Sequence, residues 1–409
     1  MSKARSLVRR FYSVPWCVPA WGRDEFFATA TALLTGSVVH GSSAEQFSAA
    51  LREYLGMKFA LPVNRGRTAI ELGLRGMEIG DGDEVVMPSY VCRSVIEAVL
   101  RTGARPVFAD IDETLNVTAS SVAAAVSDRT KCVIVAHLFG RPAAIDEIEV
   151  LLAGSKITLM DDAAQALGAR RGGRLVGSFG ACGIVSAGPG KPLAGAAGGI
   201  LVTNDPQLYE RAAALENRFE AATEVATRAI RFWVWRRLRR YTLPFQILLE
   251  RIGIAGAEPV HVNAALSNLD GAIALAQLEA LERNAADRRR NAEILTQRLS
   301  MLPGKAVTDN SPDGMAVKFV HLLPANGPTV EEVLALLADS GIEAQGGYSP
   351  LHGAYCSDVD LPNTAALWRR VLCVPLETRP KPIPPIRFTH RSGVSPVIST
   401  VPTISPTSG

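Results

Sequence analysis

The sequence predicts an α/β fold: a mostly parallel central sheet covered by helices, followed by a smaller C-terminal α/β domain. Between residues 59 and 203, short apolar runs alternate with segments of helical periodicity, the pattern of βαβ units. The runs are apolar throughout, as expected of strands that are buried on both faces. A chain of 409 residues also suits one large and one smaller domain better than a single domain.

The elements follow from local signals. Residues 22–56 are predicted as helix, glycine-containing turn and helix, with Asp24 capping the first helix and Ser42 or Ser43 the second. Strands are expected at 59–63, 84–88, 104–110, 131–137, 157–161, 180–186 and 199–203, with helices at 70–77, 89–102, 119–126 and 144–152. A long helix is expected over 270–300, then a strand at 317–323, a helix at 330–340, a strand at 344–348 and a helix within 361–371.

Four polar residues stand at the predicted carboxyl ends of strands, where catalytic groups collect in such folds. They are Ser89, His137, Asp161 and Asp162.

Lys191 lies in a run of small residues, 186–199, shortly after these acids. A lysine that acts as a nucleophile must lose its proton near neutral pH, and a glycine-rich loop lets a cofactor approach the backbone closely. An ordinary loop lysine is the simpler interpretation of this stretch taken alone. It is not a Walker phosphate loop, because Pro192 stands where Ser or Thr is required.

The turn Asn64–Ala69 joins a strand to the start of a helix and contains Gly66. Free N–H groups at such a helix start bind phosphate. Thr68 would add a hydroxyl there and Arg67 a positive charge. A plain connecting turn explains the pattern equally well.

Composition excludes several classes of protein. A net charge of +3 is too small to imply nucleic acid as a partner. The six cysteines have no CxxC spacing, which argues against a zinc site or a disulfide framework and fits a reducing compartment. We find neither an apolar stretch of about 18 residues nor a cleavable signal, so we expect a cytoplasmic protein.

Two segments have unusual composition. Arginines alternate with aromatic residues over 228–241, and 243–254 is strongly apolar. Such a segment, 228–254, can contact a membrane surface or an acidic partner, or form a solvated face with a subunit contact. The Pro-, Ser- and Thr-rich tail 379–409 is predicted to be disordered.

Together these motifs resemble the DegT/StrS-type aminotransferases, pyridoxal-phosphate enzymes of fold type I that mostly aminate keto-sugars on nucleotides. The resemblance runs from about residue 20 to 378 in motif order. The segments that carry it are 82–89, 103–112, 137–142, 161–166, the lysine loop, Asn263 with 272–278, and 348–352.

The resemblance implies a role for each matching residue. Lys191 falls where the family binds pyridoxal 5'-phosphate covalently and moves a proton, and Asp162 falls where a carboxylate pairs with the pyridine nitrogen. Gln165 lies beside the phenolic oxygen of the ring. Ser186, the turn Gly66–Arg67–Thr68 and Asn263 correspond to contacts with the phosphate. His352 ends a Tyr-x-Pro-x-His segment near the substrate, although a purely structural histidine is an alternative.

In the family the asparagine at position 263 comes from the second subunit, so the resemblance implies a homodimer with shared active sites. The chain also departs from the family. Cys92 stands where an aromatic residue usually stacks on the cofactor ring, with Tyr90 two residues earlier. Arg67 replaces a small hydroxyl residue, and the family's final helix is replaced by the tail.

The expected regions are an N-terminal arm (1–21), a large cofactor-binding domain (22–262, including the basic and aromatic segment 220–262), a helix with the small domain (263–378) and the tail (379–409). The expected activity transfers an amino group from L-glutamate to a keto-sugar, in secondary metabolism or in surface-polysaccharide synthesis. The family's dehydratase branch, which carries histidine in place of the lysine, is one alternative. A non-catalytic regulatory or membrane-surface protein is another.

Overall fold

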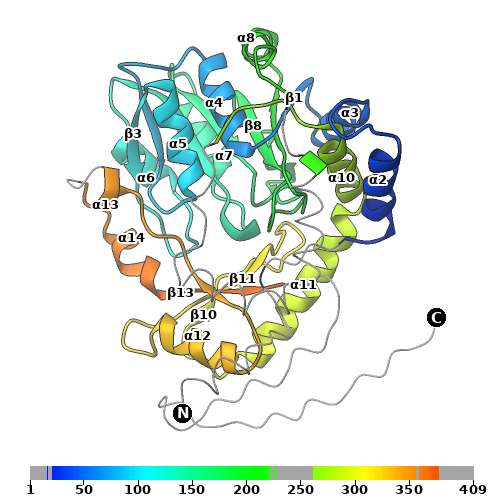
Figure 1. Ribbon diagram of the computed structural model, residues 1–409. Coiled ribbons are helices and arrows are strands. Elements are labelled where there is room, and N and C mark those ends of the chain that lie inside the picture. The colour runs from blue at the N-terminus through cyan, green and yellow to red at the C-terminus, as the bar shows by residue number, and fades with distance from the viewer. Residues whose placement is uncertain (1–15, 17–20, 222–224, 227–260, 356–358, 377–409) are drawn as a thin grey trace, which may run out of the picture.

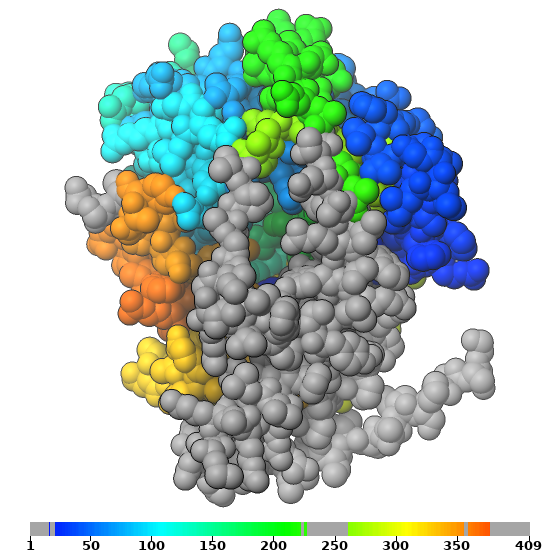
Figure 2. Space-filling model, viewed as in Figure 1, coloured from blue at the N-terminus to red at the C-terminus, as the bar shows by residue number. Residues whose placement is uncertain are grey.

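The computed structural model describes residues 16, 21–221, 225–226, 261–355 and 359–376. These residues form a seven-stranded sheet with its helices and a separate four-stranded sheet (Figure 1). Figure 2 shows the same arrangement as solid surface, with the N-terminal half at the top and the segments after residue 320 at the lower left. The predicted tail, most of the N-terminal arm and the whole of the segment 228–254 lie outside the described residues.

The large sheet has the strand order β1-β9-β8-β5-β4-β2-β3. The strands are β1 (Phe59–Val63), β2 (Glu84–Pro88), β3 (Arg105–Ala109), β4 (Thr130–Ala136), β5 (Thr158–Asp162), β8 (Cys182–Ser186) and β9 (Gly199–Thr203). The five strands from β8 to β3 in this order are parallel, and β9 runs antiparallel to both of its neighbours. The parallel strands therefore end at one edge.

Alternation along the strands divides the interior into two cores. On β8, Cys182 and Ile184 belong to one cluster of buried residues and Val185 to another, and on β9 Leu201 faces the first cluster while Ile200 and Val202 face the second. Because successive side chains point to opposite faces of a sheet, a continuous apolar run fills both cores. This confirms the expectation that the sheet is covered on both faces.

Helices alternate with the strands. They are α4 (Gly66–Gly76), α5 (Arg93–Thr102), α6 (Ala119–Ala125), α7 (Ile145–Leu152) and α8 (Pro206–Glu216). The N-terminal helices α2 (Arg23–Leu34) and α3 (Ser43–Leu55) pack against α10 (Asn268–Glu279). The minor elements are η1 (Leu138–Gly140) and a hairpin of β6 (Arg170–Arg171) and β7 (Arg174–Leu175).

The four-stranded sheet is antiparallel, in the order β10-β11-β13-β12. Its strands are β10 (Lys305–Ala306), β11 (Lys318–Leu322), β12 (Gln345–Gly346) and β13 (Val371–Pro375), and the other elements nearby are α11 (Leu281–Arg298), α12 (Val330–Asp339), α13 (His352–Tyr355), α14 (Pro362–Leu367) and η2 (Trp368–Arg370). Phe319, Leu372 and Val374 pack with residues of α11 and α12 in a third buried cluster. The small sheet therefore has a core of its own.

Several sequence predictions need correction. The long helix expected over 270–300 is two helices, α10 and α11, that meet at Ala280 and pack on different partners: α10 on α2 and α3, α11 on the small sheet. The first helix is capped at Gly22, whose N–H donates to Glu25 Oε2, rather than at Asp24. Val371, predicted as the last residue of a helix, instead begins β13, one of the two inner strands of the small sheet.

The helix predicted from Ser89 begins at Arg93 instead. Residues 89–92 belong to the carboxyl edge of β2, where Ser89 contacts a distant segment of the chain. No helix among the described residues is long and apolar enough to cross a bilayer.

Asp110, the residue after β3, holds the N-terminus of α14 at the end of that strand. Its carboxylate accepts hydrogen bonds from the backbone N–H groups of Asn363 (2.9 Å) and Thr364 (2.8 Å) and from the Thr364 hydroxyl (2.6 Å), so it caps α14. We expect Asp110→Ala to lower the free energy of unfolding by about 2 kcal/mol, because these donors lose their acceptor. Denaturant unfolding measures the change. Asp128→Ala, at an exposed position, is the control and should shift stability by less than about 0.5 kcal/mol.

Candidate active site

Two acidic residues end β5 with different roles. Asp161 is completely buried and fully engaged: its Oδ1 lies 2.8 Å from His137 Nε2, and its Oδ2 accepts the backbone N–H groups of Gly177 (2.6 Å) and Phe179 (3.0 Å). His137 Nδ1 accepts the N–H of Ala143 at 2.8 Å, so the ring donates from Nε2. Asp161 is therefore a structural anchor.

Asp162, the next residue, points to the opposite face and has few partners. Its Oδ1 accepts the backbone N–H of Ala164 at 3.0 Å. Burial raises the pKa of its carboxyl, while the nearby Lys191 ammonium is the strongest influence in the opposite direction. A buried carboxylate with so little compensation is costly unless a cation pairs with it.

The lysine loop follows β8. Lys191 is half-buried, and its N–H donates to the carbonyl of Gly188 at 3.2 Å. A Cβ on Gly188 would lie 3.9 Å from Lys191 Cγ and 3.6 Å from Ser186 Oγ. The lysine stem, the serine hydroxyl and a bare stretch of backbone are thus neighbours.

The lysine loop is held by α10 and by residues at and just before the start of α2. The indole of Trp21 donates to the carbonyl of Ala194 at 2.6 Å, and the N–H of Ala194 donates to Gln277 Oε1 at 3.1 Å. Gln277 Nε2 in turn donates to Glu25 Oε1 at 2.6 Å. No motif in the sequence indicated this support, which joins residues 21–25, 194 and 277.

The start of α4 lies against Ser186. A Cβ on Gly66 would be 3.5 Å from Ser186 Oγ, so only glycine leaves this gap free. The helix has no side-chain cap at its N-cap residue, Arg65. Its first N–H groups and the Ser186 hydroxyl therefore form a cradle suited to phosphate.

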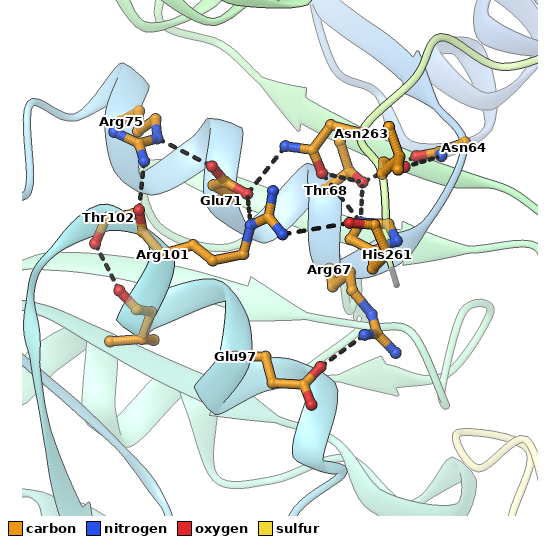
Figure 3. A network of polar contacts seen from close by, with 12 residues as sticks. Asn64, Arg67, Thr68, Glu71, Arg75, Glu97, Arg101, Thr102, His261 and Asn263 are labelled. Atoms are coloured by element: carbon orange, nitrogen blue, oxygen red, sulfur yellow. Dashed lines mark hydrogen bonds and ion pairs between the residues drawn. The ribbon is translucent and has the colours of Figure 1, made fainter. Parts of the chain in front are cut away.

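Thr68 and Asn263 meet behind this cradle (Figure 3). Thr68 Oγ1 lies 2.9 Å from Asn64 Oδ1, 3.1 Å from Asn263 Oδ1 and 3.1 Å from His261 Nε2. Asn263 Nδ2 donates to Glu71 Oε2 at 3.0 Å. The structure therefore places Asn263 against Thr68 of its own chain.

Charges surround this network. Glu71 forms ion pairs with Arg75 and Arg101, and although its burial acts in the opposite direction, the bond from Asn263 and the charge of Arg101 lower its pKa. Burial, helped by the charges of Arg67 and Arg101, lowers the pKa of His261 to about 4. His261 is therefore neutral at pH 7.

The Arg67 side chain turns away from the cradle toward α5. It donates to Glu97 Oε2 at 2.6 Å, and Arg93 contacts the other oxygen of Glu97 at 3.0 Å. Arg67 thus contributes its backbone N–H to the cradle and its charge to the surface between α4 and α5 (Figure 3).

Aromatic residues form a wall across the carboxyl edge. The phenol of Tyr348 accepts the Nε2–H of Gln165 at 3.2 Å, and its ring stacks on Phe139 with centroids 5.8 Å apart. Gln165 Oε1 accepts the Phe139 N–H at 3.3 Å. Phe139, which has φ 56°, carried no signal of this role in the sequence.

Tyr90 does not replace the missing aromatic at Cys92. It is completely buried, and its hydroxyl accepts the backbone N–H of Tyr348 at 3.2 Å. Burial raises its pKa well above the usual value. Cys92 itself is half-buried at the N-cap of α5 and accepts a hydrogen bond from Ser94.

His352 lies apart from the cradle, at the end of β2. Its Nδ1 is 2.7 Å from Ser89 Oγ. The structure therefore distributes the predicted residues along one edge: the groups around Lys191 at β5 and β8, and His352 at β2.

Comparisons with known proteins agree with this geometry. Residues 21–381 match the DegT/DnrJ/EryC1/StrS aminotransferase family. GDP-perosamine synthase of Caulobacter vibrioides is 30% identical over 314 residues, which are 75% of this chain and 76% of that protein. The aminotransferase TlmJ from Streptoalloteichus hindustanus is 26% identical, with a TM-score of 0.74 over 90% of this chain and 95% of its own. E. coli GDP-4-keto-6-deoxy-D-mannose-3-dehydratase with bound hydrated PLP has a TM-score of 0.72 at 21% identity, covering 90% and 96% of the two chains.

The fold and the site define a fold type I enzyme whose cofactor is pyridoxal phosphate. The chain belongs to the DegT/DnrJ/EryC1/StrS aminotransferase family and is an aminotransferase. The residues present fit the cofactor. Asp162 is a buried carboxylate that a cationic ring nitrogen would stabilise, and the absence of a side chain at Gly66 leaves space for a phosphate beside Ser186.

The two acids of β5 should respond in opposite ways to replacement by asparagine. A carboxyl whose pKa is raised in the folded state stabilises the fold at low pH. The protein loses this contribution as the pH rises from the pKa of the unfolded state, about 3.9, through the pKa of the folded state. Without cofactor, Asp162→Asn should therefore gain about 1 kcal/mol at pH 7, and the gain should shrink as the pH falls. Asp161→Asn should lose about 2–4 kcal/mol, because its NH2 group must face either the donor of His137 or the backbone N–H groups of Gly177 and Phe179. Thermal unfolding between pH 4 and 8 measures both. Equal losses in the two variants would contradict the distinction.

Proposed function

We propose that this aminotransferase moves an amino group from L-glutamate to a keto group of a nucleotide-linked sugar, in the synthesis of a surface polysaccharide or a secondary metabolite. The buried carboxylate of Asp162 beside Lys191, at the end of β5, is the observation that carries the reaction type. The name of the relative GDP-perosamine synthase supports a nucleotide sugar as the acceptor.

Each residue then has a definite task. When bound, pyridoxal phosphate supplies an electron sink for the carbon that exchanges its amino group. Asp162 would keep the ring nitrogen protonated, and Gln165 would contact the phenolic oxygen. Lys191 would hold the cofactor covalently and would move a proton at the reacting carbon.

The phosphate of the cofactor is proposed to lie at the start of α4. Ser186 contributes its hydroxyl, and Gly66, Arg67 and Thr68 contribute backbone N–H groups. The hydroxyl of Thr68 is already engaged behind the helix, so it supports the turn from the rear. Cys92 is proposed to contact the ring face, where a thiol covers less area than an aromatic side chain.

A dehydratase is the second candidate, because a dehydratase shares the fold. That likeness, at 21% identity, concerns the fold alone. The presence of Lys191 favours transamination, since the resemblance implies histidine at this position in the dehydratase branch.

The visible spectrum tests the first half of the reaction. Protein incubated with pyridoxal phosphate should show the absorption band of the lysine-bound cofactor, and L-glutamate should convert it to the band of the amine form. Lys191→Ala should lack the first band and lose activity on the order of 10³-fold, the scale of a lost proton-transfer group. Arg283→Ala, at an exposed position on α11, is the control.

Three outcomes separate the candidates. Conversion by glutamate supports the aminotransferase. A band that forms but ignores every amino donor contradicts transamination. A protein that never forms the band contradicts both and favours a non-catalytic role.

We also propose a homodimer with shared active sites, in which Asn263 reaches the phosphate in the partner subunit. The implied family arrangement supports this, and within one chain Asn263 still has a second Nδ2 hydrogen beyond the one that contacts Glu71.

Mixing two defective variants tests where Asn263 acts. Asn263→Ala should weaken cofactor binding about tenfold, because one hydrogen bond to a charged group is lost. If Asn263 acts across the interface, mixed dimers of Asn263→Ala and Lys191→Ala contain one intact site and regain activity under limiting cofactor. If it acts within its own chain, as its contact with Thr68 would allow, the mixture stays inactive. A monomer in sedimentation experiments would contradict the dimer itself.

Two further expectations stay proposals. Contact of residues 228–254 with an anionic membrane surface predicts salt-sensitive binding to vesicles. A cytoplasmic location rests on the scattered cysteines of the sequence.

A further inference from the structure

Ser89 and His352 form a closed hydrogen-bonded pair at the carboxyl end of β2. Ser89 is completely buried. Its Oγ lies 2.7 Å from His352 Nδ1, and the backbone N–H of His352 donates to the same oxygen at 3.1 Å. The N–H of Leu351 donates to the Ser89 carbonyl at 3.0 Å. Ser89 therefore holds both the backbone N–H and the ring of His352.

The protons in this pair follow from the chemistry of a hydroxyl, which has one proton to donate and two lone pairs to accept. The backbone N–H of His352 can only donate, so Ser89 Oγ accepts it. If Nδ1 carried the imidazole proton, it would also donate to this oxygen. The buried hydroxyl proton of Ser89 would then have no acceptor among the contacts of the described residues. With Nδ1 as the acceptor, every group is satisfied, and the neutral ring carries its proton on Nε2.

The segment that carries His352 crosses the active-site edge. Tyr348, four residues earlier, contacts Gln165, which follows β5, and Phe139, which follows β4. Ser89 follows β2, so the segment 348–352 spans the ends of three parallel strands. His352 is half-buried, and the contact with Ser89 uses Nδ1 and not Nε2.

We propose that Ser89 is a positioning residue that fixes the ring of His352 with its proton on Nε2, so that His352 donates a hydrogen bond to a carbonyl or hydroxyl oxygen of the bound substrate. The identity of that oxygen rests on the proposed aminotransferase function. The orientation of the ring and its tautomer rest on the contacts of Ser89 alone.

Nitrogen-15 NMR of histidine-labelled, cofactor-loaded protein tests the tautomer without any turnover. The chain has six histidines, and His352→Gln identifies the resonances of His352 by difference. We expect an unprotonated, hydrogen-bonded Nδ1 in the wild type. Ser89→Ala should move this resonance, and Ser89→Thr, which keeps the hydroxyl, should restore it.

The same variants should change catalysis selectively. Ser89→Ala should lower kcat/KM by about tenfold with the cofactor band unchanged, and Ser89→Thr should recover most of the loss. Ser48→Ala removes another buried serine, one that donates to the carbonyl of Ala60, and is the matched control with unchanged activity. At position 352 itself, glutamine keeps an N–H donor and should retain about tenfold more activity than glutamate, which only accepts.

The outcomes are distinct. A protonated Nδ1 in the wild type, or a resonance that ignores Ser89→Ala, overturns the proposal. An altered resonance with unchanged kcat/KM overturns the role in substrate binding. If no amino donor reacts in the wild type, the proposed function fails, and the NMR result still decides whether Ser89 sets the tautomer.

Discussion

The hydrogen bond from His137 to Asp161, 2.8 Å long in a fully buried site, is the contact on which the rest of the active site depends. It ties the end of β4 to the end of β5, while two backbone N–H groups satisfy the other oxygen of Asp161. Because successive residues of a strand face opposite ways, fixing Asp161 also fixes the direction of Asp162. Burying a second carboxylate, that of Asp162, costs free energy, but β5 is already anchored through Asp161 and stays in place. This explains how a stable sheet holds a destabilising group at its edge.

Around this edge the chain arranges polar groups from distant segments. Ser186 follows β8, the cradle begins at Gly66, and the lysine loop is held by Trp21 and Gln277. Ser186, Gly66 and Gln277 belong to a strand or a helix, and groups on such rigid elements keep the geometry of a site. The glycine at position 66 matters because any Cβ would occupy the space in front of the serine hydroxyl. Under the proposed phosphate site, the α4 N-terminus would complement the negative charge rather than the guanidinium of Arg67, which pairs with Glu97.

The second side of the site comes from the small sheet's region. Tyr348 and His352 reach the strand ends through Gln165 and Ser89, so two buried residues of the large sheet set the positions of groups contributed by the C-terminal part.

Local sequence patterns predicted much of the large sheet, several helix ends and the family. The apolar runs specified the strands of the large sheet, glycine stop signals such as Gly56 specified helix ends, and the order of motifs indicated the family, with Lys191 and Asp162 as central residues. Other features were decided only by the tertiary structure. Packing decides the break at Ala280, the strand β13 and the late start of α5. The surface that each segment packs against cannot be read from a local stretch of sequence. The same holds for the contacts of Asn263 with Thr68, of Ser89 with His352 and of Arg67 with Glu97. Hydrogen bonds and ion pairs act over about 3 Å, so residues far apart in the chain acquire these roles only when folding brings them together.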